Sequence, residues 1–205
     1  MDTDQKIETI KNWLGTGSIN VFGLPFAGKD TQCHVLTKLF LGQLIGGGDI
    51  LRSQATADEM GPTNSGDVAP TDLYLRLILP YLLHEELQHK PLVLSSVGRS
   101  HGEEPFIMDA TEKSGHTLKA VIYLAISEDD VWKRHKESSL HMHRGQRDDD
   151  EEEVLRTRLE TFQNNTQKVI EFYRQKSLLI EVDGTKTREE VTESIIDSLW
   201  RLATK

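Results

Sequence analysis

The stretch from Ile19 to Gln32 constrains the fold of this 205-residue chain more than any other. It begins with an apolar run, continues through a loop with glycine and proline, and ends at Gly28-Lys29-Asp30-Thr31, which opens a helical pattern. This order predicts strand, phosphate-binding loop and helix, because the backbone N–H groups of such a loop and the positive end of the helix dipole face the same anion. Lys29 would reach the outer phosphates, and the Thr31 hydroxyl would hold Mg²⁺. The alternative is an ordinary glycine-rich turn between a strand and a helix.

Composition limits the classes of protein to which the chain can belong. Hydrophobic residues make up 37% and charged residues 28% of the sequence, as in a single folded domain. The net charge of −9 argues against nucleic-acid binding, so the arginines of a phosphate site must be concentrated locally. One cysteine, Cys33, excludes internal disulfides, and we find neither a signal-peptide pattern nor the roughly 18 apolar residues of a membrane span. We therefore expect a cytoplasmic protein without membrane or nucleic-acid partners.

Apolar periodicity predicts strands and helices that alternate along the chain. The expected strands are short apolar runs at residues 18–23, 43–45, 91–95, 118–125 and 178–182. The expected helices cover 3–14, 29–41, a segment opened by Asp49, 71–89 with an interruption at Pro80, 104–114, a segment from Ser127 through Arg134, about 148–174, and 188–203. Residues 138–147 are expected to be irregular. This alternation predicts an α/β fold of three layers, with helices on both faces of a five-stranded parallel sheet, in one domain spanning residues 1–205.

The pattern Gly-x-Pro-x-Ala-Gly-Lys-x-Thr-Gln at residues 23–32 resembles the phosphate loop of adenylate kinases and their nucleoside monophosphate kinase relatives. The resemblance extends roughly from residue 19 to residue 196. It implies a P-loop NTPase-type fold, ATP and Mg²⁺ as cofactors, a small nucleotide as acceptor, and a monomer. It assigns the donor-nucleotide site to Gly23, Pro25, Ala27, Gly28, Lys29, Asp30, Thr31, Gln32, Arg134 and Gly184.

Further segments resemble the acceptor site of the family. Gly48-Asp49-Ile50-Leu51-Arg52 is similar to the segment whose arginine grips the acceptor monophosphate, and Ser95-Ser96-Val97-Gly98-Arg99 stands where the family has Asp-Gly-Phe-Pro-Arg. The acceptor site that this resemblance implies comprises Gly47, Arg52, Val68, Gly98, Arg99, Glu103, Arg147 and Arg158. An acceptor-binding lobe at about 48–70 and a short lid at about 135–149 are expected to close over the nucleotides and to exclude water.

Arginines are expected to carry phosphoryl transfer, because their planar fork pairs with phosphate oxygens at two points. Arg134 resembles the arginine that stacks over the donor adenine, and the segment 147–152 with Arg158 resembles the acidic and basic motif of the lid. The resemblance thus assigns catalytic roles to Lys29, Arg99, Arg134, Arg147, Asp149 and Arg158. His135, His141 and His143 either bind a metal or are exposed loop histidines. The single cysteine excludes the four-cysteine zinc site of long lids.

Three positions near the phosphates depart from the family pattern. Ser95 replaces the aspartate that helps to hold hydrated Mg²⁺, and Phe26 and Asp30 replace glycines of the phosphate loop. We hypothesise that Asp30 takes over part of the Mg²⁺ binding lost at Ser95. In the alternative, Asp30 repels the nucleotide phosphates, and the chain is an impaired kinase that acts as a nucleotide-binding regulator. Phe26 either narrows the loop or packs against a neighbour.

Two further replacements leave the acceptor base open. Adenylate kinases have a glutamine where this chain has Glu103, and Gly47 replaces a threonine. An ionised carboxylate only accepts hydrogen bonds, so it suits the two N–H donors of guanine better than the mixed edge of adenine. Glu103 therefore either reads the base or faces the solvent. The pattern favours AMP as the acceptor, with GMP, a pyrimidine monophosphate or another small acceptor as alternatives.

Overall fold

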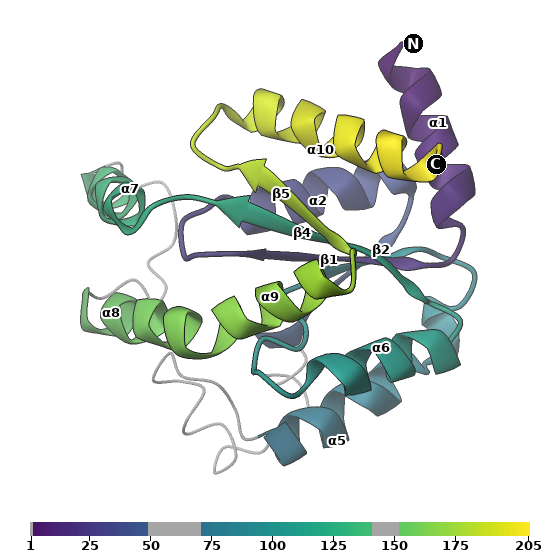
Figure 1. Cartoon of the computed structure of the whole chain (residues 1–205), viewed down its shortest axis with the longest axis horizontal. Coiled ribbons are helices and arrows are strands. Elements are labelled where there is room, and N and C mark those ends of the chain that lie inside the picture. Colours follow the sequence, from purple (N-terminus) through teal and green to yellow (C-terminus); the bar gives the residue numbers. More distant parts are fainter. Residues whose placement is uncertain (1, 49–70, 141–151) are drawn as a thin grey trace.

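The computed structural model describes residues 2–48, 71–140 and 152–205 (Figure 1). The first of these ranges contains α1 (Thr3–Leu14), β1 (Ser18–Gly23), α2 (Lys29–Phe40) and β2 (Gln43–Gly46). The second contains α5 (Thr71–Leu82), a 3₁₀ turn (Glu85–Leu87), β3 (Leu92–Ser95), α6 (Glu104–Lys113), β4 (Leu118–Ala125) and α7 (Glu128–Leu140). The third contains α8 (Glu152–Thr161), a π-helical segment (Phe162–Thr166), α9 (Gln167–Gln175), β5 (Leu179–Asp183) and α10 (Arg188–Ala203).

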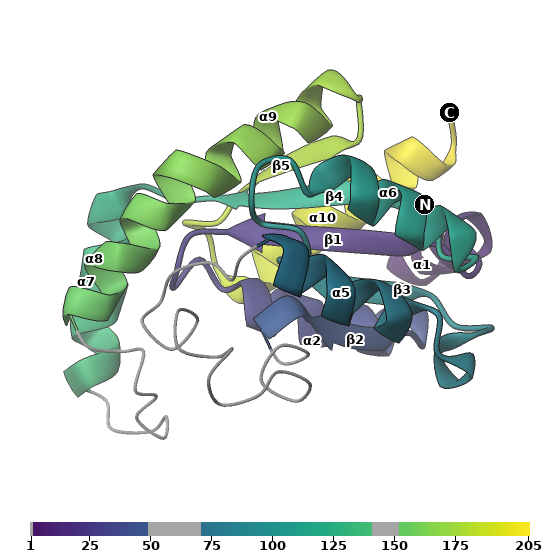
Figure 2. The same cartoon turned by 90° about the horizontal axis from the view of Figure 1, so that it is seen from below.

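The strands form one parallel sheet of five strands in the order β2-β3-β1-β4-β5. Helices α1, α2 and α10 cover one face of the sheet, and α5, α6 and α9 cover the other (Figures 1 and 2). A parallel sheet of this kind is buried on both faces, and the central strand β1 accordingly places Ile19, Val21 and Phe22 out of contact with solvent. The predicted three-layer α/β fold is confirmed.

The hydrophobic core has two parts, and the larger part includes helices from both faces of the sheet. The larger part joins β1 and β4 to α1, α2, α9 and α10, and its fully buried side chains include Leu14, Leu36 and Tyr173. The smaller part packs Leu92 and Leu94 of β3 against α5 and α6. The second part thereby positions the segment between β3 and α6, which carries Arg99.

Several predicted helix boundaries are wrong. Helix α5 ends at Leu82 instead of continuing to residue 89, with Pro80 in its last turn. The Leu83 N–H donates to the Pro80 carbonyl (3.2 Å), so the helix closes with a tighter three-residue turn. Helix α7 continues to Leu140, so residues 138–140 are helical and not irregular. The chain is also already helical at residues 47–48, before the expected start at Asp49.

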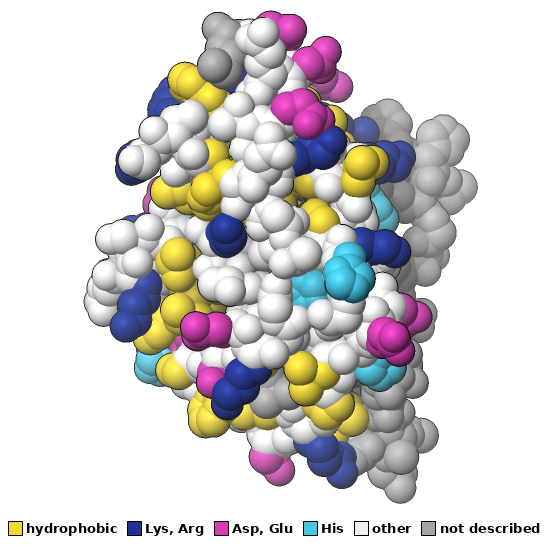
Figure 3. Space-filling model, turned by 90° about the vertical axis from the view of Figure 1, so that its right-hand side faces the viewer, with side chains coloured by type: hydrophobic (Ala, Val, Ile, Leu, Met, Phe, Trp, Pro, Cys, Tyr) yellow, Lys and Arg dark blue, Asp and Glu magenta, His cyan; other side chains and the backbone are white. Residues whose placement is uncertain are grey.

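Because all strands run in parallel, their carboxyl ends meet at one end of the sheet, on the left in Figure 1. The segments that follow β1, β2, β3, β4 and β5 therefore emerge at this end, where ligands of open α/β sheets bind. On the opposite side, basic and acidic side chains are interspersed (Figure 3). None of the described helices is both long enough and apolar enough to cross a membrane.

Candidate active site

The loop between β1 and α2 has the backbone geometry of an anion-binding loop. Gly28, the N-cap of α2, adopts a left-handed conformation with φ of 88°, and the first helical bond runs from the Gln32 N–H to the Gly28 carbonyl (3.1 Å). Apart from Gly28 itself and its two chain neighbours, no heavy atom of the described residues lies within 4 Å of the point that a Cβ of Gly28 would occupy. Gly28 has no side chain to cap the first turn, so the N–H groups of that turn are available to an anion.

Three polar side chains converge where β3 ends beside α2. The Lys29 Nζ donates to Asp30 Oδ1 (2.7 Å) and to Ser95 Oγ (3.3 Å), and Ser95 Oγ in turn donates to Asp30 Oδ1 (3.4 Å). The carboxylate of Asp30 thus lies next to the side chain that replaces the expected aspartate. The Asp30 side chain is 57% exposed, so its ion pair with Lys29 is screened by solvent and contributes little to stability.

Two other residues of α2 face the interior. Gln32 is buried; its Nε2 donates to the Arg188 carbonyl (3.0 Å), and its Oε1 accepts from Thr192 Oγ1 (2.9 Å). The side chain of Gln32 therefore joins α2 to α10, and its assignment to the donor site stays a prediction. Cys33 is also buried, and burial raises the pKa of its thiol to about 12, so it is a packing residue.

Arg134 of α7 joins the phosphate loop to the segment after β5. Its Nη1 donates to the Phe26 carbonyl (3.0 Å), and its Nη2 donates to the Gly184 carbonyl (2.7 Å). Gly184 is held in turn by its N–H, which donates to the Ala125 carbonyl (2.8 Å). A Cβ at Gly184 would lie 2.9 Å from Ile126 Cγ2, so the close approach of these segments requires glycine. Two residues of the predicted donor site, Arg134 and Gly184, are thus in direct contact beside the phosphate loop.

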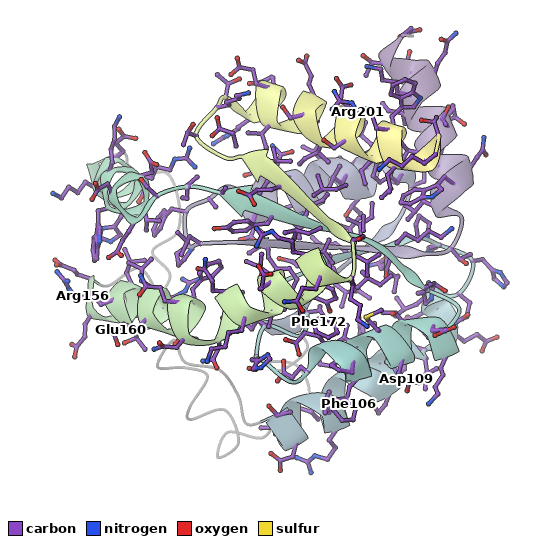
Figure 4. All side chains as sticks on the ribbon, viewed as in Figure 1. Phe106, Asp109, Arg156, Glu160, Phe172 and Arg201 are labelled. Carbon is purple, nitrogen blue, oxygen red and sulfur yellow. The ribbon has the colours of Figure 1, made fainter. Side chains whose placement is uncertain are left out.

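Phe26 has a strained backbone conformation, and its ring packs against an aromatic neighbour. Its φ of 62° lies in the left-handed region, which costs a residue other than glycine about 1–2 kcal/mol. Its ring packs edge-on against His135 (centroids 5.5 Å apart), which packs edge-on against Trp132 (6.0 Å). The Arg156 guanidinium lies 4.9 Å from the centroid of the Trp132 ring. Arg156, which Figure 4 labels, thereby connects these aromatic residues to α8. Of the two alternatives for Phe26, the structure shows packing against a neighbour.

The loop that carries Arg99 is fixed from several sides. On the β1 side, Asn20 Nδ2 donates to the Val97 carbonyl (2.7 Å) and Asn20 Oδ1 accepts from the Val97 N–H (3.3 Å). Gly98 has φ of 71°, and Thr166 Oγ1 donates to the Arg99 carbonyl (3.1 Å). The sequence reasoning missed both Asn20 and Thr166. A polar residue within the apolar run of β1 was the available signal for Asn20, whereas nothing in the sequence points to Thr166.

Glu103, the N-cap residue of α6, is only 1% exposed. Its Oε2 accepts from the Ser100 N–H (3.1 Å), and its Oε1 accepts from Thr71 Oγ1 (3.3 Å). Burial raises the pKa of Glu103, and the hydrogen bonds from Ser100 and Thr71 and the charge of Arg99 oppose this shift. The alternative that Glu103 faces the solvent is wrong.

The remaining predicted residues are only partly within the described ranges. Gly23, Pro25 and Ala27 lie in the β1–α2 segment, with Thr31 in the first turn of α2. Gly47 directly follows β2, whose last residue is paired with Ser95 at the end of β3. Arg158 is half-buried on α8, and residues 135–140 of the predicted lid form the end of α7. The acceptor-binding lobe from residue 49 onward and the rest of the lid lie outside the described residues, as do Arg52, Val68, Arg147, Asp149, His141 and His143.

The part of the chain that the structure describes contains no group of three or more His, Cys, Asp or Glu residues arranged to hold a metal ion. Within that part, His135 makes the aromatic contacts with Phe26 and Trp132. The oxygen atoms of Asp30, Thr31 and Ser95 at the phosphate loop are hard donors of the kind that Mg²⁺ prefers when a nucleotide supplies its other ligands.

Comparison with known proteins agrees with this geometry. The sequence model of the family described as adenylate kinase matches residues 21–178. The adenylate kinase of Petrotoga mobilis is 28% identical over 204 aligned residues, covering 87% of this chain and 95% of the relative. The adenylate kinase of Xylella fastidiosa strain 9a5c is 29% identical, covering 87% and 97%, respectively. That of Azobacteroides pseudotrichonymphae is 26% identical, covering 90% and 98%. This chain belongs to the adenylate kinase family.

Proposed function

We propose that this protein transfers the γ-phosphoryl group of Mg·ATP to a nucleoside monophosphate, and that AMP is the acceptor. Membership of the adenylate kinase family makes the chain an ATP-dependent phosphotransferase. The observation that carries the proposal is the convergence of the phosphate loop, Lys29, Arg134 and the Arg99 loop at the carboxyl end of the sheet. In-line positioning and positive charge are the main requirements of phosphoryl transfer, and the positive charge of these residues at one end of the sheet supports the proposal.

On the donor side, we propose that the loop backbone and Lys29 bind the β- and γ-phosphates. The ammonium group of Lys29 donates to Ser95, the last residue of β3, and so lies at the carboxyl end of the sheet. Arg134 is proposed to bind the donor base, with its guanidinium oriented by the carbonyl groups of Phe26 and Gly184. A guanidinium held by two carbonyl oxygens keeps its planar faces available for stacking.

We propose that Thr31 and Asp30 would hold Mg²⁺. Their side chains fit this ion because their oxygen atoms are hard donors. Mg²⁺ held by these residues would neutralise negative charge on the donor phosphates. Asp30 Oδ1 lies 2.7 Å from Lys29 Nζ, so Lys29 must exchange this carboxylate for phosphate oxygens when the nucleotide binds. The exposure of Asp30 makes this exchange inexpensive.

On the acceptor side, we propose that Arg99 binds the acceptor phosphate and bridges it to the donor. Gly98 fits this role because its left-handed conformation directs the chain into the Arg99 loop. The roles of Arg52, Val68, Arg147, Asp149 and Arg158 are proposed from the family resemblance. So are the acceptor-binding lobe at about 48–70 and the short lid at about 135–149. We also propose that the protein is a cytoplasmic monomer, and that it has no nucleic-acid partner, which its net charge of −9 supports.

The test is a steady-state assay of phosphoryl transfer from ATP, with and without Mg²⁺, to AMP, GMP, CMP, UMP and dTMP. We expect AMP to be the best acceptor and Lys29→Ala to reduce kcat/KM by roughly a hundredfold or more, since it removes a charge from the transferring group. Lys38→Ala is the matched control, because Lys38 is an exposed lysine in the last turn of the same helix. ATP binding without transfer to any acceptor would contradict the proposal, and a preference for GMP would replace AMP as the acceptor.

A further inference from the structure

Two adjacent buried carboxylates, Glu103 and Glu104, stand at the start of α6, directly after the Arg99 loop. Each is only 1% exposed. Glu104 accepts from the Gly102 N–H (2.6 Å) and from His101 Nδ1 (3.0 Å), both of which belong to the loop before it. Burying a carboxylate is costly unless hydrogen bonds compensate, so the partners of each carboxylate show which parts of the chain it holds in place.

The partners of Glu103 come from two different segments. One oxygen binds the N–H of Ser100, the residue after Arg99, and the other binds the hydroxyl of Thr71, which is 32 positions away and begins α5. Helices α5 and α6 lie side by side in both views (Figures 1 and 2) and share the smaller core. Glu103 is therefore a hydrogen-bonded link between the backbone beside Arg99 and the first turn of α5.

We propose that Glu103 is a positioning residue for Arg99, which it holds against the start of α5, and that it does not read the acceptor base. The inference rests on the proposed function, in which Arg99 binds the acceptor phosphate. A residue that reads a base needs a carboxylate that the ligand can reach, whereas both oxygens of Glu103 are engaged by protein donors in a buried position. Thr166 completes the support from the opposite side by donating to the Arg99 carbonyl.

The position of Arg99 matters because phosphoryl transfer depends on alignment. A displacement of about 1 Å in a catalytic group can reduce the rate roughly a hundredfold. Ser100 is the neighbour of Arg99 in the chain, so a shift of the Ser100 N–H moves the Arg99 backbone with it. Loss of the Glu103 link should therefore impair acceptor use and leave binding of ATP largely unchanged, since the phosphate loop is fixed by other contacts.

Two substitutions of Glu103 separate positioning from base reading. In Glu103→Gln, the amide carbonyl can still accept from Ser100 and the amide N–H can donate to the Thr71 oxygen, so both links can survive. We expect kcat/KM to fall no more than about threefold, and by the same factor for AMP and GMP. In Glu103→Met both links are lost, and we expect roughly a tenfold loss in kcat/KM for the acceptor with KM for ATP within about twofold. A changed ranking of AMP and GMP in Glu103→Gln would overturn the inference in favour of base reading.

A matched control uses the neighbouring carboxylate. Glu104→Met makes the same chemical change one residue later, but Glu104 has no bond to Thr71. We expect the effects of Glu103→Met and Thr71→Val on kcat/KM to combine to less than their product, because both substitutions remove the same Glu103–Thr71 hydrogen bond. The effects of Glu104→Met and Thr71→Val should multiply, because these substitutions remove different bonds. Thermal denaturation of each variant separates loss of folded protein from a change in the kinetics. Multiplicative effects in both pairs would contradict the inference.

Arg99→Ala distinguishes failure of this inference from failure of the proposed function. If Arg99→Ala leaves kcat and the acceptor KM unchanged, then Arg99 does not bind the acceptor and the proposed function of the site is wrong. If Arg99→Ala impairs transfer while Glu103→Met and Thr71→Val do not, only the positioning role of Glu103 is refuted.

Discussion

A methyl group at Gly98 should destabilise the fold through two separable terms. Gly98 has φ of 71°, and a left-handed conformation costs alanine about 1–2 kcal/mol. A Cβ at Gly98 would lie 2.5 Å from Ile107 Cγ1, and Ile107 is fully buried on α6, so the contact cannot be relieved into solvent. Overpacking of this kind costs about 1–3 kcal/mol. Gly98→Ala should therefore lower the free energy of unfolding by about 2–5 kcal/mol.

Gly115, at the other end of α6, provides the matched control. Its φ of 80° is similar, but the heavy atom nearest to the point that its Cβ would occupy, Gln88 Oε1, is 4.0 Å away. Gly115→Ala should therefore cost only the conformational term, about 1–2 kcal/mol. Equilibrium urea unfolding followed by tryptophan fluorescence measures both variants, and the midpoints can be compared while the slopes agree.

The steric explanation is tested by removing the atom that the new methyl group meets. Ile107→Ala alone should cost about 2–5 kcal/mol, because it leaves a cavity in the smaller core. Added to Gly98→Ala, it should cost about 1–3 kcal/mol less than the sum of the two single changes, because the clash is gone. Equal destabilisation by Gly98→Ala and Gly115→Ala, or additivity of Gly98→Ala with Ile107→Ala, would refute this reasoning.

Two other predictions concern charged groups. Asp30→Gly should weaken the binding of Mn²⁺ to the enzyme–nucleotide complex by about tenfold, and adding Ser95→Asp should restore this binding. Electron paramagnetic resonance measures the Mn²⁺ affinity of each variant. An unchanged affinity in Asp30→Gly would exclude a role of Asp30 near the metal. Glu190 accepts from the N–H and hydroxyl of Thr187 in the capping box of α10, and these hydrogen bonds lower its pKa from the ordinary value of 4.5. Its charge therefore adds stability above about pH 4.5 that is lost as the pH falls through the lowered pKa, so the difference in urea midpoint between the wild type and Glu190→Gln should narrow on acidification. A constant difference would contradict this explanation.

The strands and most helix starts could be predicted because their signals are local. The apolar runs at residues 18–23 and 118–125 are β1 and β4, and the Thr187–Glu190 pair forms both bonds of a capping box. Helix ends depend more on context. Pro80 disrupts the pattern of α5 in the sequence, but the helix continues through it for two residues. The last residues of α7 have a polar sequence typical of a loop, yet the capping box at Ser127 starts a helix that continues through them.

Less of the site could be predicted from the sequence, because the burial of a polar side chain depends on partners that are far away in the chain. Gln32 follows the phosphate loop, and its motif places it beside the nucleotide, but Thr192 and the Arg188 carbonyl bind its side chain 160 and 156 positions away. Glutamate is usually found at the surface, but Glu103 is buried and accepts a hydrogen bond from Thr71. No periodicity or motif encodes such pairs.

Asp30 and Ser95 show why a motif read position by position can misjudge a site. Taken separately, Ser95 lacks a carboxylate that the family has, and Asp30 adds a negative charge where phosphates bind, so each suggests impaired catalysis. The structure places Asp30 Oδ1 3.4 Å from Ser95 Oγ, although the two residues are 65 positions apart. A carboxylate acts on a metal through its position in space, so one supplied from the first turn of α2 can serve the site as well as one at the end of β3. We propose that the two departures from the family pattern are a single exchange, which predicts that the Asp30→Gly and Ser95→Asp variants compensate each other.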